Sequence, residues 1–186
     1  MRISGGEVKG RRIGLPRGCR IRPTADRVKE SLFDILPPVG GRSFLDLFAG
    51  SGCVGMEALS RGARLTAFVE KDFRLTEAIR ANLVLLGFSG RAEVVTADAQ
   101  NGLGRLAGRG KRFDILFADP PYDEGYLRET LQWLEKEDIL AEGGIIVIQH
   151  SVREAFDPSS LRTLVLTDQR RYGDTILSFI KKGEKE

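Results

Sequence analysis

The stretch FADPPYDEG, residues 117–125, places a carboxylate, a rigid turn and an aromatic ring next to one another. Asp119 follows an apolar run, and Pro120 and Pro121 cannot continue a sheet because they lack N–H groups. Methylation of a planar exocyclic amine requires acceptors that hold the NH2 hydrogens while the nitrogen lone pair faces the methyl donor. The Asp119 carboxylate and the Pro120 carbonyl are such acceptors, and Tyr122 can stack on the base. These residues predict a site for amine methylation, against the alternative of an ordinary surface turn.

A glycine-rich loop, in the segment DLFAGSGCVG, follows the first β-rich run. Gly50, Gly52 and Gly55 satisfy the G-x-G-x-x-G pattern of dinucleotide-binding proteins. Glycines let a ligand approach the backbone, and Glu70, at the end of the next β-rich run, can accept hydrogen bonds from a ribose diol. The pattern alone leaves a nicotinamide cofactor, S-adenosylmethionine and a packing turn open.

Two further acidic residues favour S-adenosylmethionine. Asp46 lies just before the glycine loop, where it is a poor neighbour for pyrophosphate but a suitable acceptor for an amino-acid ammonium. Asp98 ends the third β-rich run and can accept from an adenine amine, with Ala99 leaving room beside the ring. An equal alternative for Asp98 is that it caps the next helix.

The elements that must position these residues alternate between strand and helix. The β-rich runs are separated by helical or loop-length segments such as 73–87 and 124–136, and the runs span residues 43–48, 64–70, 92–98, 113–119 and 144–149. This alternation predicts an α/β fold with a doubly wound, mostly parallel, Rossmann-like sheet. The segment 161–182 predicts a closing antiparallel hairpin, which makes seven strands. Ligands of such sheets bind at the carboxyl ends of the strands, where the acidic residues fall.

Basic charge is concentrated at the start of the chain. Residues 1–29 carry nine basic and two acidic side chains, although the whole chain has a net charge of only +3. We predict that residues 1–38 form a basic RNA-binding extension, a small hairpin (2–13) followed by a helix (22–36), and that residues 39–182 form the main domain. A basic segment on an acidic body indicates a nucleic-acid partner, although a solvated basic surface explains the charge equally well. The candidate substrate-binding residues are Arg11, Arg12, Arg17, Arg20, Arg22 and Thr24.

Composition excludes several other classes. The 186 residues, 41% hydrophobic and 30% charged, correspond to one ordinary globular core with a small extension. The sequence has no apolar run of the roughly 18 residues that a membrane span needs and no signal-peptide pattern, so we expect a cytoplasmic protein without a membrane partner. Cys19, Cys53 and the single His150 show no metal-like spacing, and no metal is expected.

Several other residues are given structural interpretations. Cys53 is interpreted as a small packing residue rather than a nucleophile, and His150 as a polar residue at a strand end. Asn82 is interpreted as a surface or capping residue. Trp133 belongs to an apolar helical stripe and is interpreted as core.

The sequence also resembles a known family. FLDLFAGSG, FVEKD, ADA and FDILFADPPY occur in the order seen in class I S-adenosylmethionine-dependent methyltransferases that act on exocyclic amines. MRISGGEVKGRRI, RPTADRVKESLFDIL and RRYGDTILSFI resemble one branch, the bacterial 16S ribosomal RNA guanine-N2 methyltransferases of the RsmD type. The resemblance covers nearly the whole chain. It implies an enzyme that methylates the guanine N2 of 16S rRNA, in a small-subunit particle, and we expect it to act as a monomer.

The resemblance assigns site residues by position. It implies that Asp119, Pro120, Pro121 and Tyr122 hold the target base. Residues of the other motifs are then expected to contact S-adenosylmethionine: Asp46, Phe48, Ala49, Gly50, Gly52, Glu70, Lys71, Asp98 and Ala99.

Two other methyltransferase classes could use a similar turn. An adenine-N6 methyltransferase acting on DNA or RNA is the main alternative, although a DNA enzyme usually needs a sizeable sequence-reading module. About 42 residues before the first core strand leave little room for one. Protein glutamine methyltransferases favour Asn where this chain has Asp119.

Overall fold

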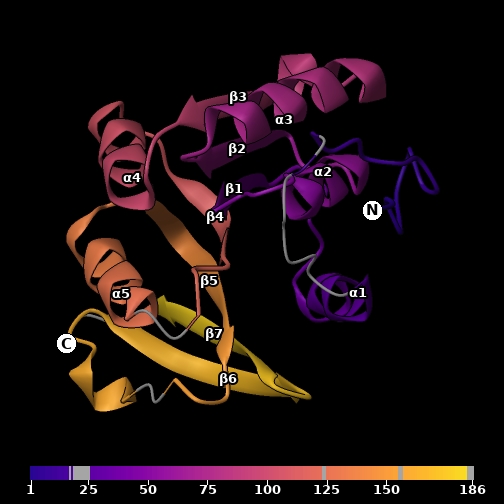
Figure 1. Cartoon of the computed structure of the whole chain (residues 1–186). Helices are drawn as coiled ribbons and strands as arrows, with labels where there is room; N and C mark the ends of the chain where they lie inside the picture. Colours follow the sequence, from indigo (N-terminus) through magenta and orange to yellow (C-terminus); the bar gives the residue numbers. More distant parts are fainter. Residues whose placement is uncertain (17, 19–25, 123–124, 155–156, 184–186) are drawn as a thin grey trace.

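The computed structural model describes residues 1–16, 18, 26–122, 125–154 and 157–183. Its elements alternate along the chain and form one seven-stranded sheet (Figure 1). The helices are α1 (Asp26–Ile35), α2 (Cys53–Ser60), α3 (Phe73–Leu86), α4 (Ala99–Gly108) and α5 (Tyr126–Lys136), with short 3-10 turns η1 (Ser89–Arg91) and η2 (Pro158–Ser160). The strands are β1 (Ser43–Leu47), β2 (Leu65–Glu70), β3 (Ala92–Thr96), β4 (Phe113–Ala118), β5 (Leu140–Ser151), β6 (Leu164–Tyr172) and β7 (Thr175–Lys182).

The strand order is β3-β2-β1-β4-β5-β7-β6, and the first five of these strands are parallel. β7 runs antiparallel to both β5 and β6, so the predicted doubly wound sheet with its closing hairpin is confirmed. The chain order reverses between β1 and β4, which is the position where ligands bind in open α/β sheets. One boundary was wrong: β5 begins at Leu140, four residues before the predicted run. Leu140 pairs with Phe113, and the register then shifts before Ile145 pairs with Ile115.

Helices cover both faces of the sheet. Leu32 of α1, Met56 of α2 and Ile79 of α3 belong to one buried cluster, and Leu103 of α4 and Leu131 of α5 belong to the other. Figure 1 shows the corresponding separation of α1, α2 and α3 from α4 and α5. Full burial of each such side chain contributes about 1.5–3 kcal/mol, so the two clusters fix the helices on the sheet.

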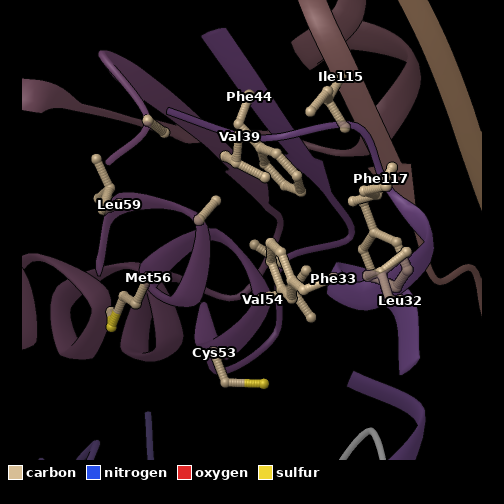
Figure 2. Close-up of a cluster of buried hydrophobic side chains, with 14 of the residues drawn as sticks. Leu32, Phe33, Val39, Phe44, Cys53, Val54, Met56, Leu59, Ile115 and Phe117 are labelled. Carbon is tan, nitrogen blue, oxygen red and sulfur yellow. The ribbon is translucent and has the colours of Figure 1, made fainter. Parts of the chain in front are cut away.

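The first cluster connects the amino-terminal part of the chain to the sheet (Figure 2). The rings of Phe33, from α1, and Phe44, from β1, stack with centroids 6.2 Å apart. Phe117 of β4 and Val54 of α2 are buried in the same cluster. The packing therefore continues from α1 across α2 to the two central strands.

The predicted amino-terminal hairpin is present. Arg2 and Arg12 form an antiparallel bridge, and the Ile3 N–H donates to the Arg11 carbonyl at 3.0 Å. Ile3 and Ile13 are buried in the first cluster. The following helix is described from Asp26, so its predicted cap, Thr24, lies outside the described residues.

Asn82 of α3 also holds this part of the chain, and its interpretation as a surface or capping residue was wrong. Its side chain is buried; Oδ1 accepts from the Gly14 N–H at 3.0 Å, and Nδ2 donates to the Gly14 carbonyl at 2.9 Å. Both backbone groups of Gly14 are thus satisfied by one amide, three residues before the undescribed part of the basic segment begins.

Among the described residues, no helix has both the length and the apolar character needed to cross a membrane.

A buried ionic network joins the hairpin to α1 and α2. The Glu57 carboxylate accepts from the Ser4 N–H at 2.7 Å and from Arg61 Nε at 2.9 Å, and it lies 3.4 Å from the buried Lys29 ammonium. Lys29 also donates to the Arg2 carbonyl at 2.5 Å. Burial opposes ionisation of Glu57, but the hydrogen bonds from Ser4 and Arg61 and the Lys29 charge outweigh it and lower the pKa of Glu57.

We expect Glu57→Gln to lower the free energy of unfolding by roughly 3 kcal/mol or more, because Lys29 loses its buried counter-charge. The lowered pKa means that the carboxylate stabilises the fold fully above its unfolded pKa of about 4.3. This contribution is lost as the pH falls through the lower, folded value. Urea unfolding between pH 7 and pH 3 should therefore show a gap between wild type and variant that is full at pH 7 and closes in acid.

The matched control is Glu77→Gln, which breaks the exposed pair with Arg80. It should change the unfolding free energy by less than about 1 kcal/mol. Equal effects of the two substitutions would contradict a special role for the buried network.

Candidate active site

A cavity of about 420 Å³ lies at the carboxyl ends of the parallel strands, in the range of roughly 300–1,000 Å³ usual for small-molecule sites. It gathers all the predicted catalytic residues and all but one of the predicted cofactor residues, the exception being Gly52. The lining residues that the sequence analysis did not select are Ser51, Cys53, Val54, Val69, Ala97, Phe117, Tyr126 and Trp133.

The glycine loop is shaped by contacts with two strands. Asp46 of β1 crosses beneath the loop, and its Oδ2 accepts from the Gly55 N–H at 2.8 Å. Phe48 adopts a left-handed conformation with φ 63°, which costs a residue with a side chain roughly 1–3 kcal/mol. The Ala49 N–H, which donates to the Val69 carbonyl at 2.9 Å, stabilises this turn.

Gly52 and Gly55 serve the fold of the loop. Gly52, with φ 73°, is the N-cap of α2 and is not among the residues that line the cavity. A Cβ on Gly55 would lie 2.3 Å from the ring of Phe68, so only glycine lets α2 pack this closely on β2. The predicted cofactor contact of Gly52 stays a prediction.

Glu70 is bound to backbone on both of its oxygens. Oε2 accepts from the Gly50 N–H and Oε1 from the Asp72 N–H, each at 2.8 Å. The carboxylate thus ties the end of β2 to the glycine loop. Each oxygen has a second lone pair, so the same side chain can still accept from a ligand.

Asp98 caps α4, as the alternative interpretation of this residue proposed. Its Oδ1 accepts from the Asn101 N–H at 2.8 Å, and Asn101 Nδ2 donates to Oδ2 at 2.7 Å. These bonds lower the pKa of Asp98 and keep it ionised. Because Asp98 also lines the cavity, the cap fixes its carboxylate at the wall.

Gln149 of β5, which the sequence analysis missed, contacts the Asp-Pro-Pro-Tyr turn. Its Nε2 donates to Asp119 Oδ1 at 3.1 Å and to the Tyr122 hydroxyl at 2.9 Å. Ala118 pairs with Ile148 in the parallel register, so the residues that follow them lie side by side. The signal in the sequence was that Asp119 and Gln149 each directly follow a run of buried apolar residues.

The wall of the cavity is strongly acidic. It carries the carboxyl groups of Asp46, Glu70, Asp98 and Asp119, and Lys71 is the one cation among the described lining residues. Burial, with additional repulsion from Asp119 and Glu70, raises the pKa of Asp46 well above its usual range, although the Gly55 N–H opposes this shift. Such a wall suits a ligand that carries positive charge and disfavours a phosphate-bearing one.

Aromatic and sulfur groups complete the wall. The rings of Phe48 and Tyr126 meet edge to face with centroids 6.4 Å apart. Trp133 is half-buried: it packs against the second hydrophobic cluster and also lines the cavity, so its interpretation as a core residue holds only in part. Burial raises the pKa of the Cys53 thiol to about 11, so it is a poor nucleophile. His150 is buried beside Ser178 and does not line the cavity.

The predicted substrate-binding residues are described only in part. Arg11 and Arg12 are exposed on the amino-terminal hairpin. Met1, at the start of this hairpin, contacts the loop of the cavity, because the Ser51 hydroxyl donates to its Sδ at 3.3 Å. The other candidates lie outside the described residues, namely Arg17, Arg20, Arg22 and Thr24.

Comparison with known proteins gives consistent similarities. A family model described as Conserved hypothetical protein 95 matches residues 1–181. YlbH of Bacillus subtilis, provisionally named an rRNA methyltransferase, is 41% identical over 184 residues, 98% of this chain and 99% of that protein. Ribosomal RNA small subunit methyltransferase D of Escherichia coli is 40% identical over 153 residues, 82% of this chain and 75% of that one. The solved structure of yhhF of Escherichia coli, provisionally named a methyltransferase, has a TM-score of 0.84 and 33% identity, and the match covers 100% of this chain and 99% of that one.

We expect Asp46→Asn to make the protein more stable at neutral pH, because the amide oxygen of the variant can accept from the Gly55 N–H without a buried charge. The pKa of Asp46 is raised in the folded protein above its unfolded value of about 4. Wild-type stability therefore falls as the pH rises from that unfolded pKa through the folded pKa. The advantage of the variant in urea unfolding should therefore be absent in acid and grow toward pH 8.

Asp114→Asn is the matched control with the opposite sign. Hydrogen bonds from the Ser43 N–H and hydroxyl, both at 2.7 Å, outweigh partial burial and lower the pKa of Asp114. This variant should lose stability at pH 7. An Asp46→Asn variant that is also less stable than wild type at pH 7–8 would contradict the electrostatic account of the cavity.

Proposed function

This chain belongs to the family described as Conserved hypothetical protein 95, the RsmD-like class I methyltransferases, and on that basis we propose that it methylates ribosomal RNA. The resemblance noted in the sequence is thereby confirmed. We further propose that it transfers a methyl group from S-adenosylmethionine to the exocyclic N2 of a guanine in 16S rRNA of the small ribosomal subunit. The observation that carries this proposal is the Asp119–Tyr122 turn at the rim of an acidic cavity.

The chemistry of the cavity fits S-adenosylmethionine. When bound, this cofactor supplies an electrophilic methyl group on a positively charged sulfonium, and it carries a second positive charge on its ammonium. Asp46 would accept from the ammonium, Glu70 from the ribose hydroxyls and Asp98 from the adenine amine. We assign supporting contacts to Phe48, Ala49, Gly50, Lys71 and Ala99, all of which line the cavity.

The turn residues would hold the target amine. The Asp119 carboxylate and the Pro120 carbonyl accept the two N2 hydrogens, which leaves the lone pair directed into the cavity. Partial negative charge beside the nitrogen stabilises the positive charge that develops on it during attack. Tyr122 would stack on the flipped guanine, and the paired prolines keep the turn stiff.

We propose that the basic start of the chain forms the RNA-binding surface. Residues 1–38 would form an extension to the methyltransferase domain of residues 39–182, with the arginines beyond Arg11 and Arg12 continuing the basic surface. The contact between Met1 and Ser51 supports this proposal, because it brings the hairpin to the cavity loop. A small-subunit particle as substrate, a monomeric and cytoplasmic enzyme, and chemistry without a metal stay predictions.

We expect labelled S-adenosylmethionine to give N2-methylguanosine when the protein acts on small-subunit particles from cells that lack the gene. Digestion of the RNA to nucleosides identifies the product. Asp119→Ala should reduce methyl transfer by several orders of magnitude and change cofactor affinity little, because the carboxylate acts mainly on the transition state.

The control is Asp157→Asn, a remote aspartate that caps a 3-10 turn. It should keep wild-type turnover. N6-methyladenosine as the product would replace the guanine assignment, and an Asp119→Ala variant with near-normal turnover would remove the turn from the mechanism.

We also expect replacement of Arg11, Arg12, Arg17, Arg20 and Arg22 by Gln to weaken RNA binding. The log-log slope of affinity against salt should fall by somewhat under one unit for each phosphate that the protein no longer neutralises. The measurement is RNA affinity at several salt concentrations, with S-adenosylmethionine affinity recorded in parallel to check folding.

Three arginines at the opposite, amino edge of the sheet provide the control: Arg64, Arg109 and Arg112. Their replacement by Gln should leave the log-log slope of RNA affinity against salt close to that of wild type. Equal slopes for all three proteins would assign RNA binding to another surface.

A further inference from the structure

The Asp119 carboxylate stands at a strand end where its own chain offers few donors. An aspartate at such a position is commonly held by backbone N–H groups of the next residues. Here those residues are Pro120 and Pro121, which have no N–H. A donor that the structure shows in their place is the side-chain amide of Gln149, on the neighbouring strand β5.

The orientation of this amide follows from its neighbours. Nε2 has two hydrogens, and its two acceptors are Asp119 Oδ1 and the Tyr122 hydroxyl. A reversed amide would set Oε1 against the Asp119 carboxylate, acceptor against acceptor. The amide therefore bridges the group that would hold the amine and the ring that would stack on the base.

Gln149 occupies this position at a cost to stability. Its side chain is buried, and within the described part of the chain its Oε1 has no hydrogen-bond partner. A buried unsatisfied acceptor in a native protein calls for an explanation other than stability. An apolar side chain of similar length would carry no such cost.

We propose that Gln149 is a positioning residue that holds Asp119 and Tyr122 in the geometry needed to grip the target amine; this rests on the proposed function of the Asp119–Tyr122 turn. With Oδ1 engaged by Gln149, the rotation of the Asp119 carboxylate is restricted and its other oxygen is directed by the same bond. The Gln149 amide also fixes the distance between the Asp119 carboxylate and the Tyr122 hydroxyl. The intervening Pro120 and Pro121 cannot do so, because they have no backbone N–H to donate.

The experiment compares Gln149→Met and Gln149→Glu with wild type. Met keeps the length of the side chain and removes its polar atoms, whereas Glu keeps its shape and replaces the donor by a carboxylate. We expect both variants to lose kcat for methyl transfer on the order of 10- to 100-fold, the scale for a small misplacement of a reacting group. The dissociation constant for S-adenosylmethionine should change less than twofold.

Thermal unfolding separates positioning from a structural role. Gln149→Met should unfold within a few degrees of wild type, because removal of the unsatisfied Oε1 offsets the loss of the hydrogen bonds to Asp119 and Tyr122, which are half-buried and can bind water instead. The matched control is Gln169→Met, which removes a glutamine that donates to Ser178 on the same sheet at 2.8 Å, outside the cavity, and should keep wild-type kcat.

Each other outcome overturns the inference in a distinguishable way. An active wild type with an equally active Gln149→Met variant would refute the positioning role alone. Loss of kcat together with a markedly lower unfolding temperature in Gln149→Met would make Gln149 a structural residue. A wild type that methylates no RNA would refute the proposed function and this inference with it.

Discussion

Convergence of four carboxyl groups on one cavity is the constraint on which the geometry of the site depends. Like charges at the ends of adjacent strands repel, so each group must be held by donors that do not come from the ligand. The structure supplies them from loops, from the first turns of α2 and α4 and from one neighbouring strand: Gly55 for Asp46, Gly50 and Asp72 for Glu70, Asn101 for Asp98 and Gln149 for Asp119. The carboxylates in turn hold the segments that donate to them. The glycine loop is fixed by Asp46 at Gly55 and by Glu70 at Gly50, in addition to the conformational preferences of its own residues.

A second set of buried polar contacts holds the amino-terminal hairpin, which carries Arg11 and Arg12 and contacts the cavity loop through Met1 and Ser51. Glu57 and Asn82 hold the hairpin from α2 and α3, so the start of the chain is attached to the helices that pack on β1 and β2. Binding of RNA phosphates in the cavity itself would be unfavourable, because its carboxylates repel them. In the proposed function, separation of the two charges would let one surface bind the RNA backbone while the other accepts an amine and a cationic cofactor.

The mostly parallel sheet with its closing hairpin and the turn at Asp119 could be predicted because they depend on local signals, namely apolar runs and prolines. Contacts between distant residues could not. The Ser4–Glu57 and Gly14–Asn82 bonds join residues 53 and 68 positions apart. Asn82 shares a helical face with Leu75 and Ile79, but nothing in the sequence indicates the backbone partner that its polar side chain finds there. Gln149 depends on the register of β4 and β5, which shifts between Phe113 and Ile115 before it settles. The early start of β5 was missed because Gly143 and Gly144 resemble a turn.

Three of the costs that the structure carries lie close to the cavity. Asp46 is a buried carboxyl with a raised pKa, Phe48 is in a left-handed conformation, and Gln149 has an unsatisfied oxygen. Each of these features lowers stability in the protein alone. A ligand that brings positive charge to Asp46 would offset the cost of burying this carboxyl group. The conformation of Phe48 and the position of Gln149 each help to keep a turn beside the cavity rigid. This distribution is expected of a site whose geometry is set by what it binds, because selection for stability alone would have removed all three.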